Sequence, residues 1–222
     1  MDWYAAYVGA VSRAMNVTMG TKSTPRERIL RTACELFARH GIRAVGVDTI
    51  VARSRVAKMT LYRHYPSKDE LAMEFLRRRR EFSLAWQAEV ERRKLPPAKS
   101  LLAVFDALDR WYRQPDYAGC PVIKTVLEVE APGHPLRAAA EEHFAGVRDF
   151  VRRLAGQAGL RDPEEIARQW HLLILGSVVA ACAGDVDAAR RAKEVARAIL
   201  AAAAFPRRRV RRASARIGSS AG

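Results

Sequence analysis

The chain has 222 residues, of which 49% are hydrophobic and only 8% aromatic, and it carries a formal net charge of +15. This length allows one large or two small domains with a substantial core. Because Ala, Leu, Arg and Glu dominate and alternating Val, Ile and Thr are rare, the composition favours an all-α protein over a β-rich one. Three cysteines without a CxxC pair indicate neither a disulfide framework nor a zinc site, so we expect no metal and no cofactor.

The positive charge is concentrated in two segments. Residues 22–68 hold 11 Lys and Arg against 3 acids, and residues 206–222 hold 6 Arg and no acid. Residues 69–205 are nearly balanced, with 21 basic and 20 acidic residues. Cations clustered in this way favour a nucleic-acid partner.

The sequence also bears on location. The start of the chain lacks the basic region and long apolar core of a signal peptide. The most apolar run, residues 170–183, contains His171 and is shorter than the roughly 20 residues of a membrane-spanning helix. We therefore expect a cytoplasmic protein with no membrane partner.

The first 22 residues show no strong pattern, and we interpret them as an extension that is either disordered or a loosely docked helix. The first helix of the main pattern then begins with Thr24, Pro25 and Glu27, which form a capping box with proline at the first helical position. Gly41 is expected to end it.

Two short helical patterns follow, at residues 47–53 and 57–65, separated by about three residues. This is the spacing of a helix-turn-helix, whose second helix enters the major groove of DNA. A rotation of 100° per residue places Leu61 and Tyr65 on one side of the second helix, where they should pack. The other side and its flanks carry groups suited to contacts with double-stranded DNA: Lys58, Met59, Thr60, Tyr62, Arg63, His64 and Lys68.

One stretch of the chain resembles the DNA-binding region of the TetR family of bacterial transcriptional repressors. It begins at Thr24 with TPRERILRTACELFARHG and ends with TLYRHYPSKDEL. Two residues differ from the family pattern. Arg55 stands in the turn where glycine is usual, and Val47 replaces a capping Ser or Thr, for which Gly46 can substitute. Each difference costs about 1 kcal/mol locally.

The resemblance implies base contacts by Lys58, Met59 and Arg63, and phosphate contacts chiefly by Tyr62, His64 and Lys68. The chemistry of the side chains agrees, because Arg or Lys can bind guanine O6 and N7 and a methionine can contact a thymine methyl. The Thr60 hydroxyl can also bind a phosphate oxygen. For Tyr62 a second interpretation stays open, in which its ring packs inside the small helical head.

Pro66 and Ser67 then break the chain, and Ser67 with Glu70 forms a second capping box for a helix over residues 68–93. An apolar stripe runs along this helix: Leu71, Phe75, Phe82, Trp86 and Val90. The four arginines at 77–80 wrap around more than one turn, so we interpret most of them as a solvated face paired with Glu74 and Glu81.

Five more helices complete a total of about nine, at residues 98–114, a short one ending at 129, 136–155, one capped by Asp162 that runs to about 183, and 186–205. The motifs DYAGCPV and GHPLR resemble a C-terminal domain of one TetR subgroup, which extends the resemblance to residues 24–205. We therefore divide the chain into the extension (1–22), a three-helix head with the helix-turn-helix (23–68), a larger helical effector-binding and dimerisation domain (69–205) and a basic disordered tail (206–222).

The run from 170 to 183 is apolar almost all round, which indicates burial on more than one side. TetR-like proteins form homodimers through their last two helices. We expect the partner subunit to contact Leu173, Gly176, Ser177, Ala180 and Ala181.

The resemblance also implies a small-molecule pocket among the middle helices. The candidate lining residues are Trp86, Phe105, Leu108, Trp111, Tyr112, Cys120, Val126, His143, Phe144 and Trp170. Ordinary core packing is the alternative for each of them. His143 and His171 lack the paired spacing of a metal site, and a thiol-sensor role for Cys120 has no recognisable activating neighbour.

These patterns predict a DNA-binding transcriptional regulator, a repressor that a small apolar ligand releases from a pseudo-palindromic operator. The alternative is a non-specific basic or architectural DNA-binding protein without an effector, for which the arginine tail and net charge would suffice. An enzyme is disfavoured, since the chain has no GxSxG, HExxH, Walker or dinucleotide-binding motif.

Overall fold

A computed structural model of the chain describes residues 23–115 and 117–204. Within these ranges the regular structure is α-helical throughout, in nine helices: α2 (Pro25–His40), α3 (Val47–Ser54), α4 (Lys58–His64), α5 (Lys68–Arg92), α6 (Pro97–Tyr112), α7 (Pro121–Glu128), α8 (Pro135–Gln157), α9 (Pro163–Cys182) and α10 (Ala188–Ala204). The predicted all-α class is confirmed. The interpretations of residues 1–22 and of the tail at 206–222 lie outside the described residues.

The head consists of α2, α3 and α4. The predicted capping box starts α2, because the Thr24 hydroxyl accepts a hydrogen bond from the Glu27 amide at 3.2 Å and the Thr24 amide donates to the Glu27 carboxylate at 2.8 Å. Gly41 ends α2 with a φ of 84°, a value that glycine adopts without strain.

The turn between α3 and α4 begins at Arg55, which has the left-handed conformation that glycine usually provides, with φ 53° and ψ 49°. A residue with a Cβ atom pays about 1 kcal/mol for this conformation. The turn is nevertheless held, because the Arg28 side chain donates from Nε to the Ser54 carbonyl at 3.3 Å and from Nη1 to the Ser23 carbonyl at 2.8 Å. The departure from glycine is thus accommodated without loss of the helix-turn-helix.

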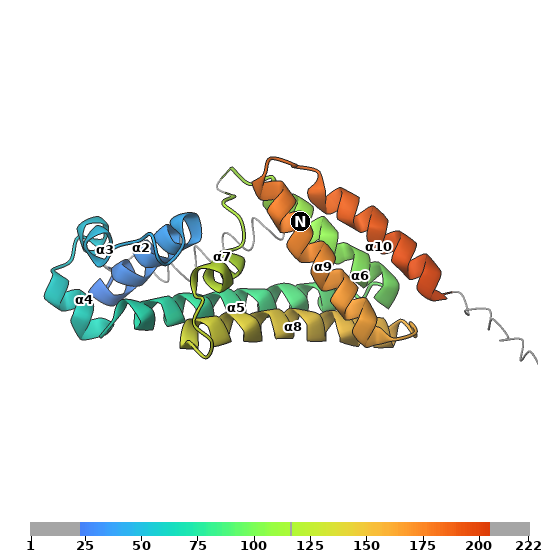
Figure 1. Cartoon of the computed structure of the whole chain (residues 1–222), viewed down its shortest axis with the longest axis horizontal. Helices are drawn as coiled ribbons and strands as arrows, with labels where there is room; N and C mark the ends of the chain where they lie inside the picture. The colour runs from blue at the N-terminus through green and yellow to red at the C-terminus, as the bar shows by residue number, and fades with distance from the viewer. Residues whose placement is uncertain (1–22, 116, 205–222) are drawn as a thin grey trace, which may run out of the picture.

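The long helix α5 joins the head to the rest of the molecule. It has 25 residues, which corresponds to about 37 Å. It starts at Ser67, whose hydroxyl accepts from the Glu70 amide at 3.1 Å, the first of the two bonds of the predicted capping box. Figure 1 shows α5 and α8 side by side along the long axis, with the head at one end and α6, α9 and α10 gathered at the other.

The core has two main parts. Around the head, Phe37 of α2 and Phe75 of α5 pack edge to face with ring centroids 5.7 Å apart, and this cluster continues into Val122 of α7 and Leu136 of α8. In the C-terminal domain, the fully buried ring of Trp170 lies 6.0 Å from that of Phe105. Because α7 and α8 contribute to the cluster of the head, no flexible linker separates the two parts.

Helix boundaries differ from the prediction by one or two residues at most places. Prolines occupy the first helical position of α6 and α8, one residue earlier than expected. The last helix starts at Ala188, not at Val186, because the Asp187 amide donates to the Asp185 carboxylate at 3.1 Å in a turn that precedes it. Of the described helices, none has the length and hydrophobicity to span a membrane.

Candidate DNA-binding surface and ligand cavity

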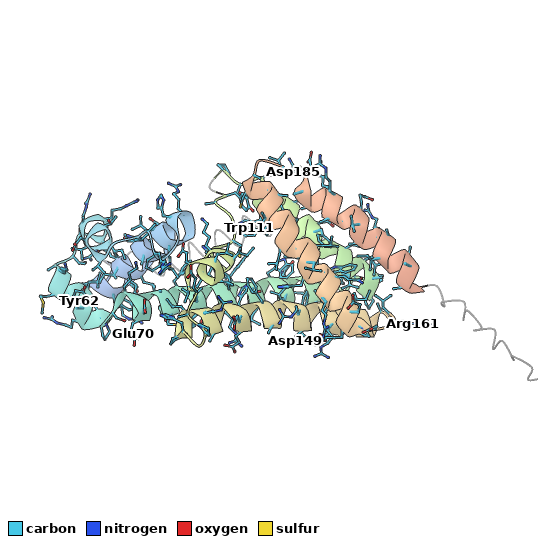
Figure 2. The ribbon with its side chains drawn as sticks, viewed as in Figure 1. Tyr62, Glu70, Trp111, Asp149, Arg161 and Asp185 are labelled. Carbon is cyan, nitrogen blue, oxygen red and sulfur yellow. The ribbon has the colours of Figure 1, made fainter. Side chains whose placement is uncertain are left out.

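Helix α4 has one buried and one exposed side. Leu61 and Tyr65 are 0% and 4% exposed and pack into the core of the head, as the helical periodicity predicted. Met59 is 73% exposed and Tyr62 is 38% exposed, and Figure 2 shows Tyr62 at the end of the head that lies away from the C-terminal domain. The second interpretation of Tyr62, packing inside the head, is therefore not supported.

The other predicted DNA contacts share this end of the head, with differing freedom. Lys58 and Arg63 are exposed, whereas Thr60 and His64 are half-buried. Lys58 Nζ pairs with the Asp48 carboxylate of α3 at 2.8 Å, and this hydrogen bond raises the pKa of the ammonium. A phosphate oxygen can replace such an exposed partner at little cost.

Lys68 differs from the other predicted contacts. Its Nζ donates to the Arg43 carbonyl at 3.3 Å, and burial lowers the pKa of its ammonium. The side chain is thus turned towards the junction of the head with the C-terminal domain, and a phosphate would have to displace a backbone carbonyl to reach it.

The charges of the head are not neutralised within the described structure. Between residues 23 and 68, Lys58 is the sole basic side chain with a carboxylate of a described residue within 4.0 Å. By contrast, arginines throughout the C-terminal domain form ion pairs, for example Arg137 with Glu141 and Arg168 with Glu164. The positive surface of the head is therefore available to a polyanion.

A cavity of about 140 Å³ lies between α5, α6, α7, α8 and α9. Six of the predicted lining residues border it: Trp86, Leu108, Trp111, Cys120, His143 and Phe144. The structure adds others that were not predicted, among them Arg79, Phe82, Ser83, Val122, Ile123, His171, Ile174 and Val178.

Four of the predicted lining residues lie elsewhere. Phe105 and Trp170 are in the core of the C-terminal domain, Tyr112 is buried with its hydroxyl 2.8 Å from that of Ser177, and Val126 packs against the cluster of the head. Sequence spacing identified these residues as inward-facing, but which of two neighbouring inward positions meets a cavity depends on how the helices cross.

The polar groups of the cavity are unusual. His143 Nδ1 and His171 Nδ1 are buried and have no hydrogen-bond partner among the described residues. Burial lowers the pKa of both imidazoles to about 4, so both are neutral at pH 7. Burial also raises the pKa of the Cys120 thiol, which opposes the thiolate that a redox sensor requires.

No cluster of potential metal ligands occurs in the described part of the chain.

Comparisons with known proteins match both the helix-turn-helix head and the C-terminal domain. The family described as "Bacterial regulatory proteins, tetR family" matches residues 29–75, and the family described as "Tetracyclin repressor-like, C-terminal domain" matches residues 97–199. The HTH-type transcriptional regulator YjdC of Escherichia coli K12 is 28% identical over 179 residues, which cover 76% of this chain and 91% of that protein. The HTH-type transcriptional regulator LmrA of Bacillus subtilis 168 is 30% identical over 121 residues, or 54% of this chain and 64% of LmrA.

Among solved structures, SCO4454, a TetR-family transcriptional regulator from Streptomyces coelicolor, superposes with a TM-score of 0.78 and 27% identity over 82% of this chain and 96% of that one. This chain belongs to the TetR family. It is a DNA-binding transcriptional regulator and not an enzyme. The rival view of a non-specific architectural protein is not favoured.

In this TetR-family regulator, α7 connects the cavity to the head. Its N-terminal residues Pro121 to Ile123 line the cavity, while Lys124 and Glu128 face the end of α2. Lys124 Nζ donates to the carbonyls of Ala38 and Arg39 at 3.1 and 3.0 Å. The cation therefore binds carbonyls of the last turn of α2, where the helix dipole is negative.

Glu128 completes this contact, which we call the α7 clamp and define as the Lys124 and Glu128 bonds to the end of α2. Its carboxylate accepts from the amides of Ile42 and Arg43 at 2.8 and 3.0 Å. The same carboxylate lies where a Cβ atom on Gly41 would be, only 1.7 Å from that position. Helical spacing of four residues predicts that Lys124 and Glu128 share a face, but only the fold shows what that face meets.

The predicted dimer contacts on α9 differ in how exposed they are. Gly176 is exposed, whereas Leu173, Ala180 and Ala181 are half-buried against their own subunit. Ser177 is 5% exposed in its own subunit and hydrogen-bonds with Tyr112, so its side chain faces inward, and its predicted contact with the partner subunit stays a prediction. The exposed apolar side chains of α9 are Leu172 and Val179, which are 69% and 57% exposed.

Proposed function

We propose that this TetR-family regulator is a homodimeric repressor that binds a pseudo-palindromic operator and is released from it by a small molecule in the cavity. The observation that carries the proposal is the α7 clamp, since one short helix contacts both the cavity and the head. A ligand that favours one position of α7 thereby favours one position of the head.

The exposed side of α4 supplies the DNA contacts. Arg63 and Lys58 are assigned to guanine and Met59 to a thymine methyl. Thr60, Tyr62, His64 and Lys68 are assigned to phosphate oxygens, with Lys68 exchanging its Arg43 carbonyl for DNA.

Arg63→Ala is expected to reduce discrimination between the operator and operators mutated at one base pair by about 1–3 kcal/mol, because a base contact is lost. Tyr62→Phe is the matched variant, since it removes only a hydroxyl that can bind phosphate. This variant should weaken binding to all DNA sequences to a similar degree. Titrations of operator, mutated operator and random DNA by fluorescence anisotropy measure both effects. An equal loss on all three for Arg63→Ala would show that Arg63 does not read sequence.

The dimer is formed through α9 and α10, which pack against each other. Both helices expose apolar side chains, Leu172 and Val179 on α9 and Val195, 49% exposed, on α10. Large aliphatic side chains on neighbouring helices are typical of a surface that another subunit covers. The proposal requires the two heads of this dimer to enter successive major grooves of the operator.

Removing the charges of the α7 clamp should uncouple ligand binding in the cavity from DNA binding by the head. In the variant with Lys124→Met and Glu128→Gln, operator affinity without ligand is expected to stay within a few-fold, while the 5- to 150-fold weakening typical of a bound effector disappears. The compound that most strongly releases the parent protein in a screen serves as the effector in anisotropy titrations. The control is Lys99→Met with Glu130→Gln, which removes the same two charges at exposed positions. If the effector still released the clamp variant fully from the operator, α7 would be excluded as the connection between the cavity and the head.

The direct test of the proposed function is selection of bound sequences from a random DNA pool, followed by competition with random DNA at physiological salt. The proposal expects an inverted repeat whose half-sites lie about one helical turn apart. Failure to enrich any sequence, with random DNA competing equally, would favour binding through charge alone.

A further inference from the structure

The cavity carries a cation without a counter-ion among the described residues. Of the four consecutive arginines on α5, Arg77 pairs with Glu74 and Glu81, Arg78 with Glu74, and Arg80 with Glu142 of α8. Arg79 alone of the four borders the cavity, and no carboxylate of a described residue lies within ion-pairing distance of it. A half-buried charge of this kind is costly unless something compensates it.

The position of Arg79 is fixed by the helix. It follows Phe75 by four residues and precedes Phe82 and Trp86 by three and seven, so it lies on the apolar stripe of α5 and not on the solvated side. Its guanidinium carbon is 5.4 Å from the centroid of the buried Phe75 ring. This cation–π contact orients the guanidinium but leaves its hydrogen-bond donors available.

The two histidines add polar atoms to an otherwise apolar chamber. His143 on α8 and His171 on α9 lie on either side of Phe144, whose ring centroid is 6.0 and 5.4 Å from theirs. Each neutral imidazole has one N–H donor and one acceptor nitrogen, and Nδ1 is unpartnered in both. Arg79 and the two imidazoles thus supply several donors to one chamber.

No Asp or Glu lines the cavity, and the Arg79 guanidinium would repel an ammonium ligand. The other walls are aliphatic and aromatic, including Trp86, Trp111 and Phe144. At about 140 Å³ the cavity resembles the roughly 150 Å³ apolar cavities that hold a benzene ring. The chamber therefore fits a single ring or a short branched chain with one anionic group.

We propose that the effector is a small monocarboxylic acid, whose carboxylate pairs with the Arg79 guanidinium and whose hydrocarbon body fills the chamber beside His143 and His171. This inference rests on the proposed function for its regulatory meaning, but not for the binding event. An arginine pairs with a carboxylate through two parallel hydrogen bonds, which a neutral amide cannot reproduce. Binding would also bring negative charge into the chamber that Val122 and Ile123 of α7 line.

The test uses matched sets of acid, amide and amine built on the same skeleton: phenyl, benzyl, 2-methylpropyl and pentyl. Each is titrated into the purified full-length protein by calorimetry, with quenching of tryptophan fluorescence as a second signal. At least one acid is expected to bind about tenfold or more tightly than its own amide, which is the loss expected for a hydrogen bond to a charged group. The amines should not bind detectably.

Arg79→Gln should remove the preference for acid over amide, and Arg79→Lys should keep part of it. Arg77→Gln is the matched control, because it removes the same charge from the outer side of α5 and should leave the preference intact. Unchanged operator binding by each variant without ligand shows that it is folded and dimeric. The proposal is overturned if no acid exceeds its amide, or if Arg79→Gln retains the preference. Acid binding without operator release would instead contradict the proposed function alone.

Discussion

The double variant Leu172→Asp with Val179→Asp is expected to be monomeric and to bind the operator about a thousandfold less tightly than the parent. A specific complex is at least about 10³-fold tighter than a non-specific one, and a single head keeps only half of the specific contacts. Two carboxylates that enter an apolar subunit interface lose their hydration without gaining partners. Both leucine and valine side chains are already exposed in the isolated subunit, so their replacement should not unfold it.

Sedimentation equilibrium and operator titrations at the same protein concentration measure the two effects together. Leu84→Asp is the matched control, since Leu84 is 53% exposed but lies on α5, whose main helix contacts are α2, α6 and α8. It should remain dimeric with full operator affinity. A monomeric double variant that binds the operator as tightly as the parent would show that dimerisation contributes nothing to recognition.

Trp170→Ala is expected to lower the free energy of unfolding by about 3–5 kcal/mol, the range for truncating a fully buried aromatic side chain. The indole is 0% exposed, and its Nε1 donates to the Leu101 carbonyl of α6 at 3.1 Å, a buried hydrogen bond that the substitution would also remove. Urea denaturation at fixed protein concentration measures the change, because the stability of a dimer depends on concentration.

Trp111→Ala is the comparison for this measurement. Trp111 is half-buried and lines the cavity, so its truncation enlarges a space that already exists and should cost less than that of Trp170. The two tryptophans should also differ in ligand binding, which Trp111→Ala should weaken. Equal losses of stability would mean that the cavity wall is packed as tightly as the core.

The sequence predicted the helices and the exposed side of α4 because local rules decide them. Capping by Thr24 and the period that buries Leu61 depend on residues within one or two turns. The resemblance to a known family added the division into head and C-terminal domain. These parts of the structure required no knowledge of how distant helices meet.

The cavity could be predicted only in part, for a physical reason. Arg79 lies on the apolar stripe of α5, a signal that its spacing from Phe75 and Phe82 already contained, yet the surrounding run of arginines favoured a solvated interpretation. Ser177 was predicted to contact the partner subunit, but in its own subunit its hydroxyl pairs with the buried Tyr112 hydroxyl, which required a partner. Which inward residue faces a void depends on the crossing of five helices, and no local pattern encodes it.

Mutation of Gly41 should change how the repressor responds to its effector. The Gly41 backbone has a φ of 84°, and the Glu128 carboxylate occupies the volume of any side chain attached there. A substitution would push that flexible carboxylate away and free the amides of Ile42 and Arg43. Mutations at this codon, remote from the chamber, should therefore give a repressor that stays on the operator whatever the cell contains, and would be mistaken for lesions in effector binding.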